Sequence, residues 1–191
     1  MKCIICKIFS LKLICKSCQK TFLKPSRSTR ILPDGFKIYS FYFYKDIEEL
    51  LKTKHTHIGS SIYAILAKNA FLEFAKEFTF SSQIYAIGID DHVRSGYSHT
   101  AILTDALKSK NIKPVFNKLR AKNSVSYSGE SLTFRLENTR DFEYTFKSDI
   151  DAILVDDIVT TTTTINEAKN TLRKSKVNPL FALTLADARE Q

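Results

Sequence analysis

The stretch Asp151–Ile165, which reads DAILVDDIVTTTTTI, constrains the fold of this chain more than any other segment. An apolar run, Ala152–Val155, leads into two adjacent carboxylates, Asp156 and Asp157, and five consecutive threonines follow after two residues. A helical pattern comes next. A buried strand, a polar loop and a helix start form an anion site, because loop N–H groups and the helix dipole both point toward the anion. The stretch therefore predicts a strand–loop–helix unit that holds a phosphate.

The residue types in this unit favour a sugar phosphate as the ligand. Asp156 and Asp157 can accept hydrogen bonds from the vicinal hydroxyls of a ribose. The loop that can surround the phosphate consists of Thr160, Thr161, Thr162, Thr163 and Thr164. Neither G-x-x-x-x-G-K-[ST] nor G-x-G-x-x-G occurs, so the sequence does not support a P-loop or a Rossmann site. The alternative is a threonine-rich surface turn in which the aspartates cap a helix.

Strand and helix patterns alternate through the rest of the chain. The predicted strands are Phe36–Phe43, Ile84–Ile89, Val115–Leu119, Ile153–Val155 and Leu180–Leu185, and the predicted helices include Ser61–Phe78 and His99–Lys108. This order predicts an α/β fold, a mainly parallel sheet flanked by helices. Ligands bind at the carboxyl ends of the strands in such sheets. We therefore expect the loops Asp90–Tyr97 and Asp156–Thr164 to lie at one edge.

All four cysteines lie near the N-terminus in a C-x2-C-x8-C-x2-C pattern, as Cys3, Cys6, Cys15 and Cys18. Two such pairs are typical of a tetrahedral structural zinc site, so we expect a small zinc-ribbon-like module that binds Zn²⁺. The alternative is two disulfides, which a cytoplasmic location disfavours. Four cysteine ligands leave no open position on the metal, so the pattern does not predict a catalytic zinc.

The positive charge is concentrated in the same segment. Residues 1–30 hold eight Lys or Arg and no Asp or Glu, whereas the whole chain has a net charge of +9. A basic module of this kind often binds nucleic acid, and a general lysine bias is the alternative. We expect two domains: residues 1–30 as the zinc-binding module with its linker, and residues 31–191 as the main domain. The polar, proline-bounded stretch Lys20–Pro33 is interpreted as the linker and runs across this boundary.

The sequence also bears on location. No apolar run approaches the roughly 18 residues that a membrane-spanning helix needs. The N-terminal apolar residues are interrupted by lysines and cysteine pairs, and no small-residue cleavage site follows them. We therefore expect a cytoplasmic protein without membrane insertion.

Ile153–Ile165 resembles the phosphoribosyl pyrophosphate (PRPP) signature of type I phosphoribosyltransferases: apolar residues, Asp-Asp/Glu, two residues, then Thr-Thr-Gly-Ala-Thr. Four cysteines ahead of such a domain are similar to the arrangement in the ComF family of competence proteins. The resemblance implies a type I phosphoribosyltransferase-like fold, in which Asp156 and Asp157 are catalytic and bind the ribose hydroxyls, while Thr160–Thr164 hold the 5-phosphate. It further implies Mg²⁺ between pyrophosphate and ribose oxygens. The implied setting is natural transformation, with single-stranded DNA and DNA-uptake or recombination proteins as partners.

Weaker matches add further PRPP-binding candidates. Lys52 and Lys54 stand where ComF-like chains carry Leu-Lys-Tyr, and Gly96–His99 resembles the family's Gly-Phe-Asn-Gln segment. Arg94 is the one basic residue left in the loop expected to face the pyrophosphate. An Arg-x-x-Asn pair is matched by Arg135 and Asn138. Each of these could instead be an ordinary surface or capping residue.

Two departures from the family pattern leave the function open. Thr162 replaces the loop glycine, so we expect strain of ~1 kcal/mol or more if the position requires a positive φ. The family's Pro-Val-Pro-Leu-His stretch is here Ile87–His92, which carries less positive charge. One hypothesis is therefore a PRPP-dependent transferase with an unknown acceptor. The other is a non-catalytic single-stranded-DNA-binding adaptor whose pocket senses a ligand.

Overall fold

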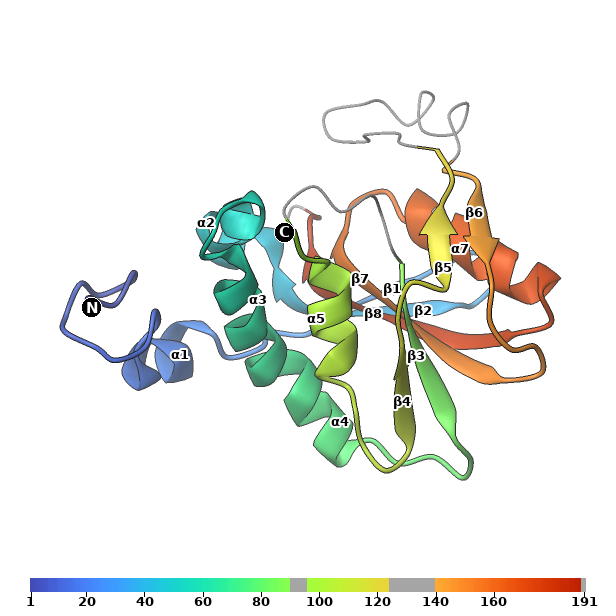
Figure 1. Ribbon diagram of the computed structural model, residues 1–191, viewed down its shortest axis with the longest axis horizontal. Helices are drawn as coiled ribbons and strands as arrows, with labels where there is room; N and C mark the ends of the chain where they lie inside the picture. The colour runs from blue at the N-terminus through green and yellow to red at the C-terminus, as the bar shows by residue number, and fades with distance from the viewer. Residues whose placement is uncertain (90–95, 124–139, 190–191) are drawn as a thin grey trace.

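A computed structural model describes residues 1–89, 96–123 and 140–189 of the chain. Its main sheet has six strands in the order β1-β2-β8-β7-β3-β4 (Figure 1). Their bounds are β1 Ser28–Ile31, β2 Lys37–Phe43, β8 Asn178–Asp187, β7 Asp151–Val159, β3 Ile84–Gly88 and β4 Ile112–Val115. Only the β1–β2 pair is antiparallel among these neighbours. The predicted α/β class with a mainly parallel sheet is therefore confirmed.

Helices cover both faces of this sheet (Figure 1). The helices of the described residues are α1 Lys16–Phe22, α2 Tyr44–Leu51, η1 Lys52–His55, α3 Gly59–Ala67, η2 Lys68–Leu72, α4 Glu73–Glu77, α5 His99–Asp105 and α7 Thr163–Lys174, of which α1 lies apart from the sheet. Successive side chains of β7 point to opposite faces of the sheet, as expected for a strand. Ile153 and Val155 join the apolar cluster that contains Tyr63 of α3, whereas Ala152 and Leu154 join the cluster under α7. The sheet is thus buried on both sides, which explains the unbroken apolar run before the carboxylates.

A small second sheet lies beside α7. It pairs β5 Leu119–Ala121 with β6 Phe142–Tyr144 in antiparallel register (Figure 1). The predicted strand Val115–Leu119 is wrong, because β4 ends at Val115 and β5 begins at Leu119. Between them Asn117 adopts a left-handed φ of 56°, which interrupts an extended chain.

The long predicted helix Ser61–Phe78 is present with an interruption. The segment begins as α3, widens into the π-helical turn η2 and continues as α4. Phe71 of η2 and Phe74 of α4 both contact Phe41 of β2, with ring centroids 4.7 and 6.2 Å away. The widened turn is therefore accommodated by aromatic packing on the sheet, which periodicity along the helix does not reveal.

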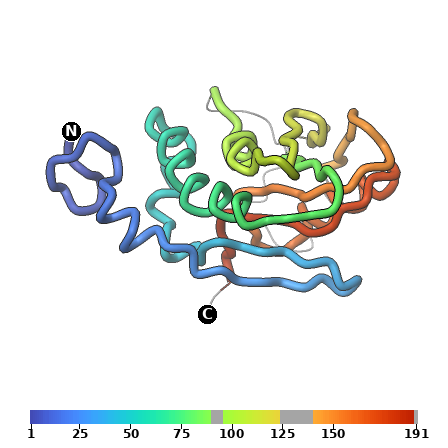
Figure 2. Tube along the Cα trace, turned by 90° about the horizontal axis from the view of Figure 1, so that it is seen from below, coloured from blue at the N-terminus to red at the C-terminus, as the bar shows by residue number. Residues whose placement is uncertain are grey.

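The N-terminal segment lies at one end of the molecule, beyond α2 and α3 (Figures 1 and 2). Its buried residues Cys3, Ile14, Cys18 and Leu23 belong to the same apolar cluster as the helices of the main domain. The predicted linker Lys20–Pro33 is wrong in part, because it contains the end of α1 and the whole of β1. No helix in the described ranges is long and apolar enough to cross a membrane.

Candidate functional site

The carboxylate pair lies near the carboxyl end of β7, which extends further than the sequence predicts. The strand continues through Asp156 and Asp157 to Val159, in parallel register with β8. Within this register Asp156 stands opposite Thr184, and Val159 stands opposite Asp187. The two aspartates therefore belong to the strand itself, which is paired with β8 here, and the loop begins only at Thr160.

Asp157 faces the helices α3 and α5. Its Oδ2 accepts hydrogen bonds from Lys54 Nζ at 3.3 Å and Tyr63 Oη at 3.4 Å, and 15% of its side chain is exposed. Burial raises the pKa of Asp157, but the positive charge of Lys54, with a smaller contribution from His99, outweighs burial, and the pKa is lowered. Asp157 is thus an ionised acceptor at neutral pH.

Asp156 is the protonated member of the pair at neutral pH. Burial, together with the charge of Asp157 beside it, raises the pKa of Asp156 to about 8. Its Oδ1 accepts the backbone N–H of Asp157 at 2.8 Å. This hydrogen bond and the positive charge of Arg140 both lower the pKa of Asp156, but they offset only part of the increase. A ligand that brings hydroxyl donors or a cation would favour ionisation here.

The threonine loop joins β7 to α7. Thr160 and Thr161 are exposed, and the hydroxyls of Thr161 and Thr163 lie 3.1 Å apart. Thr162 has φ 65° and ψ −5°, so this β-branched residue adopts the left-handed conformation in which strain is expected. From Thr163 the 12-residue α7 begins, and its first turn contains no acidic residue. The N-terminal end of the α7 dipole therefore faces the loop without a competing carboxylate in the first turn, which favours an anion there.

Of the weaker sequence candidates, some lie beside the carboxylate pair and others do not. Lys54 pairs with Asp157, whereas the Lys52 amine lies 3.1 Å from Glu48 and 2.7 Å from Glu49 on the exposed side of α2. Tyr97 donates its hydroxyl to the Lys54 carbonyl at 2.5 Å. Ser98 caps α5 by accepting the Ala101 N–H at 3.1 Å. The candidates Arg94, Arg135 and Asn138 lie outside the described residues.

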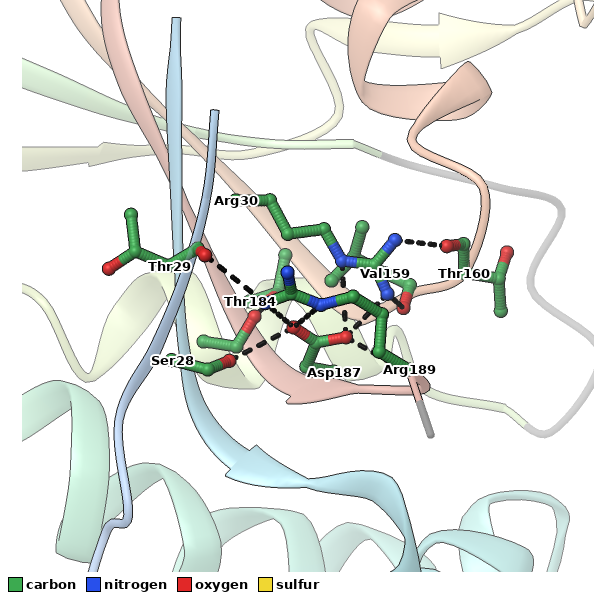
Figure 3. A network of polar contacts seen from close by, with 9 residues as sticks. Ser28, Thr29, Arg30, Val159, Thr160, Thr184, Asp187 and Arg189 are labelled. Carbon is green, nitrogen blue, oxygen red and sulfur yellow. Dashed lines mark hydrogen bonds and ion pairs between the residues drawn. The ribbon is translucent and has the colours of Figure 1, made fainter. Parts of the chain in front are cut away.

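Sequence reasoning missed Arg30 and Asp187, which lie directly beside the start of the loop (Figure 3). Asp187 is fully buried at the end of β8, and the Arg30 guanidinium contacts both Asp187 and the Val159 and Thr160 carbonyls. Arg30 belongs to the predicted linker, where one basic residue among several carries no distinguishing signal.

The four cysteines form a separate cluster whose geometry fits a metal. Their sulfur atoms all lie within 4.8 Å of one another, and Cys6 Sγ is 3.8 Å from Cys15 Sγ. Tetrahedral Zn–S bonds of about 2.3 Å require sulfur separations of about 3.8 Å. Backbone N–H groups of Cys15 and Cys18 donate to sulfurs at 3.3 and 3.4 Å, which favours thiolates. The cluster can hold a metal such as zinc.

Comparisons with known proteins give structural matches only. No protein-family model matches the chain, and no curated protein does. A hypoxanthine phosphoribosyltransferase from Staphylococcus aureus is 17% identical, with a TM-score of 0.41 over 67% of this chain and 64% of that enzyme. The orotate phosphoribosyltransferase from Aeropyrum pernix is 21% identical, with a TM-score of 0.42 over 90% of this chain and 80% of that one. The strand order described above rests on the pairing within this chain and is independent of these similarities.

Proposed function

We propose that this chain is a ComF-like protein of natural transformation that binds PRPP with Mg²⁺ and transfers its phosphoribosyl group to an acceptor. The observation that carries the proposal is the continuous unit of β7, Asp156–Asp157, the threonine loop and α7. It presents carboxylates to a ribose and hydroxyls, amides and a helix dipole to its 5-phosphate. The resemblance of Ile153–Ile165 to the PRPP signature supports the same ligand.

The carboxylate pair also suits Mg²⁺, a hard cation that prefers oxygen ligands. A cation bound with the ligand would favour the ionised form of Asp156, whose pKa is raised by burial and by the charge of Asp157. When bound, Mg²⁺ would neutralise charge that develops on the departing pyrophosphate. In the transfer the C1–pyrophosphate bond breaks as the acceptor bonds to C1, and Asp156 and Asp157 hold the ribose in position.

Calorimetry with PRPP and Mg²⁺ tests the pocket. Wild-type protein should bind, and the double variant Asp156→Asn/Asp157→Asn should bind at least tenfold more weakly. Asp151→Asn is the matched control, because Asp151 lies on the same strand at its opposite end. A double variant that binds like the control would refute the pocket. A pyrophosphate-release screen over candidate acceptors then tests transfer.

The second candidate function is a single-stranded-DNA adaptor, and the surface of the N-terminal module favours it. The lysines Lys2, Lys7, Lys12, Lys16 and Lys20 are exposed there. Phe9 and Phe22 are 75% and 58% exposed among them. Basic side chains interleaved with aromatic rings are typical of surfaces that bind single strands, because bases stack on the rings and phosphates pair with the lysines.

Salt dependence tests the DNA hypothesis. Affinity for a single strand should fall steeply with salt, and both the affinity and the salt slope should drop when Lys7, Lys12 and Lys16 are replaced by Gln. The control replaces the exposed Lys108 and Lys110, which lie between α5 and β4 in the main domain, and the exposed Lys113 of β4. A flat salt response would rule the hypothesis out. If Asp156→Asn/Asp157→Asn abolishes PRPP binding but leaves transformation intact, the adaptor function is favoured over the transferase.

A further inference from the structure

A charge network at the end of β8 connects the N-terminal strand β1 to the threonine loop (Figure 3). Its centre is the fully buried carboxylate of Asp187. The donors to it are Ser28 Oγ at 3.0 Å, Arg30 Nε at 3.1 Å, Arg30 Nη2, and Arg189 through its backbone N at 2.9 Å, Nε at 3.0 Å and Nη2 at 2.7 Å. A buried carboxylate is costly unless it is paired and hydrogen-bonded. Two guanidinium groups meet that need here.

The two arginines differ in what else they contact. The Arg30 side chain is 12% exposed, and its Nη2 lies 3.3 Å from the Val159 carbonyl, while Nη1 donates to the Thr160 carbonyl. Arg189 is 46% exposed, and beyond Asp187 it reaches the Thr29 carbonyl at 3.1 Å. Arg30 therefore joins the buried carboxylate to the first two peptide units of the loop, and Arg189 joins it to β1.

Holding these carbonyls determines where the loop amides point. In a trans peptide unit the C=O and the following N–H point in opposite directions. The Val159 carbonyl also accepts the Ala188 N–H at 2.9 Å, so the sheet holds it without Arg30. The contact of Arg30 with the Thr160 carbonyl directs the N–H of Thr161 away from the network. Amides already fixed in one orientation do not have to be ordered when an anion binds, which raises affinity.

We propose that Arg30 is a positioning residue of the phosphate loop and that Asp187 holds Arg30 in place. The proposal rests on the proposed function of the loop. It assigns β1, the strand that follows the four-cysteine module, a part in ligand binding. Arg30 and Thr160 are 130 residues apart in the sequence, so only the fold brings this strand to the loop.

Lysine substitutions separate positioning from charge balance. Arg30→Lys keeps the positive charge beside Asp187 but removes the planar fork that joins the carboxylate to two carbonyls. Arg189→Lys is the matched control, since it changes the second arginine on the same carboxylate. Affinity for ribose 5-phosphate, measured by calorimetry, should fall at least tenfold in Arg30→Lys and change less than twofold in Arg189→Lys. Equal affinities in the two variants would overturn the proposal.

A second readout needs no ligand and stays decisive if the wild type does not bind ribose 5-phosphate. Backbone ¹⁵N order parameters of Thr160–Thr162 should be near the rigid value of about 0.85 in wild type and in Arg189→Lys. They should fall below about 0.6 in Arg30→Lys. Unchanged order in Arg30→Lys would overturn the positioning role. Absence of binding with a rigid wild-type loop would instead refute the proposed function alone.

Discussion

Replacing Thr162 by glycine should stabilise the protein. Thr162 has φ 65° and ψ −5°, which is the left-handed region, and it is β-branched. A non-glycine residue in such a conformation costs about 1–3 kcal/mol. Glycine relieves this strain but loses about 0.5–1 kcal/mol through the greater freedom of the unfolded chain. The net gain for Thr162→Gly is therefore about 1 kcal/mol.

Thermal unfolding measures this gain. For a chain of 191 residues a gain of about 1 kcal/mol corresponds to a rise in Tm of about 2–4 °C. Thr161→Gly is the matched control, because Thr161 precedes Thr162 in the same loop and is not among the residues with positive φ. The control should lower Tm, since it adds unfolded-state freedom and removes the hydroxyl contact to Thr163.

The comparison of the two variants decides the argument. A fall in Tm for Thr162→Gly that matches the control would show that Thr162 is unstrained, and the inference from its φ angle would be wrong. A rise in Tm would mean that this chain tolerates strain at the loop. The affinity of the Thr162→Gly variant for ribose 5-phosphate also tests whether Thr162 affects the proposed ligand binding.

Three further predictions concern the metal site, the Asp156 carboxyl and the ion pair between Asp34 and Lys169. Freshly purified, reduced protein should contain about one zinc per chain by elemental analysis, and its absence would contradict the four-thiolate site. Asp156→Asn should raise Tm at pH 8 but not at pH 4. The pKa of Asp156 is about 8 in the folded state, against an ordinary value of 3.8. The unfolded chain therefore ionises this carboxyl at lower pH than the folded protein does, and the wild type loses stability as pH rises from 3.8 to about 8. A gain of about 1–3 kcal/mol at pH 8 is expected, and a gain independent of pH would refute the assignment. Asp34→Asn should lower Tm, because Lys169, whose side chain is 3% exposed, loses its carboxylate partner at 2.7 Å. Asp105→Asn, on an exposed position of α5, should leave Tm within 1 °C, and equal effects of the two variants would contradict the role of Asp34.

The local parts of the site could be predicted because neighbouring residues determine them. The apolar run Ala152–Val155 has the composition of a doubly buried strand, and β7 is such a strand. The helical pattern after the loop corresponds to α7, whose buried face contains Ile165, Ala168 and Leu172. The roles of these residues toward PRPP stay predictions.

Contacts between distant segments could not be predicted. Lys169 reads as part of the polar face of α7, yet it is buried against Asp34 and the Phe36 ring from the β1–β2 turn. The π-helical turn η2 depends on packing against Phe41 of another strand. Nothing within a window of one helix or strand reports such partners, because they come from elements far away along the chain.

The sequence by itself determined the strand–loop–helix unit at Asp151–Lys174, the clustering of charge in the first 30 residues and the cysteine spacing. These features are local, and local propensity and periodicity encode them. Only the tertiary structure decided which charges surround the unit. The fold brings Lys54 to Asp157 across 103 residues and Arg30 to Asp187 across 157. The burial that shifts the pKa values of the two aspartates is likewise a product of packing, because desolvation depends on what covers a side chain in space.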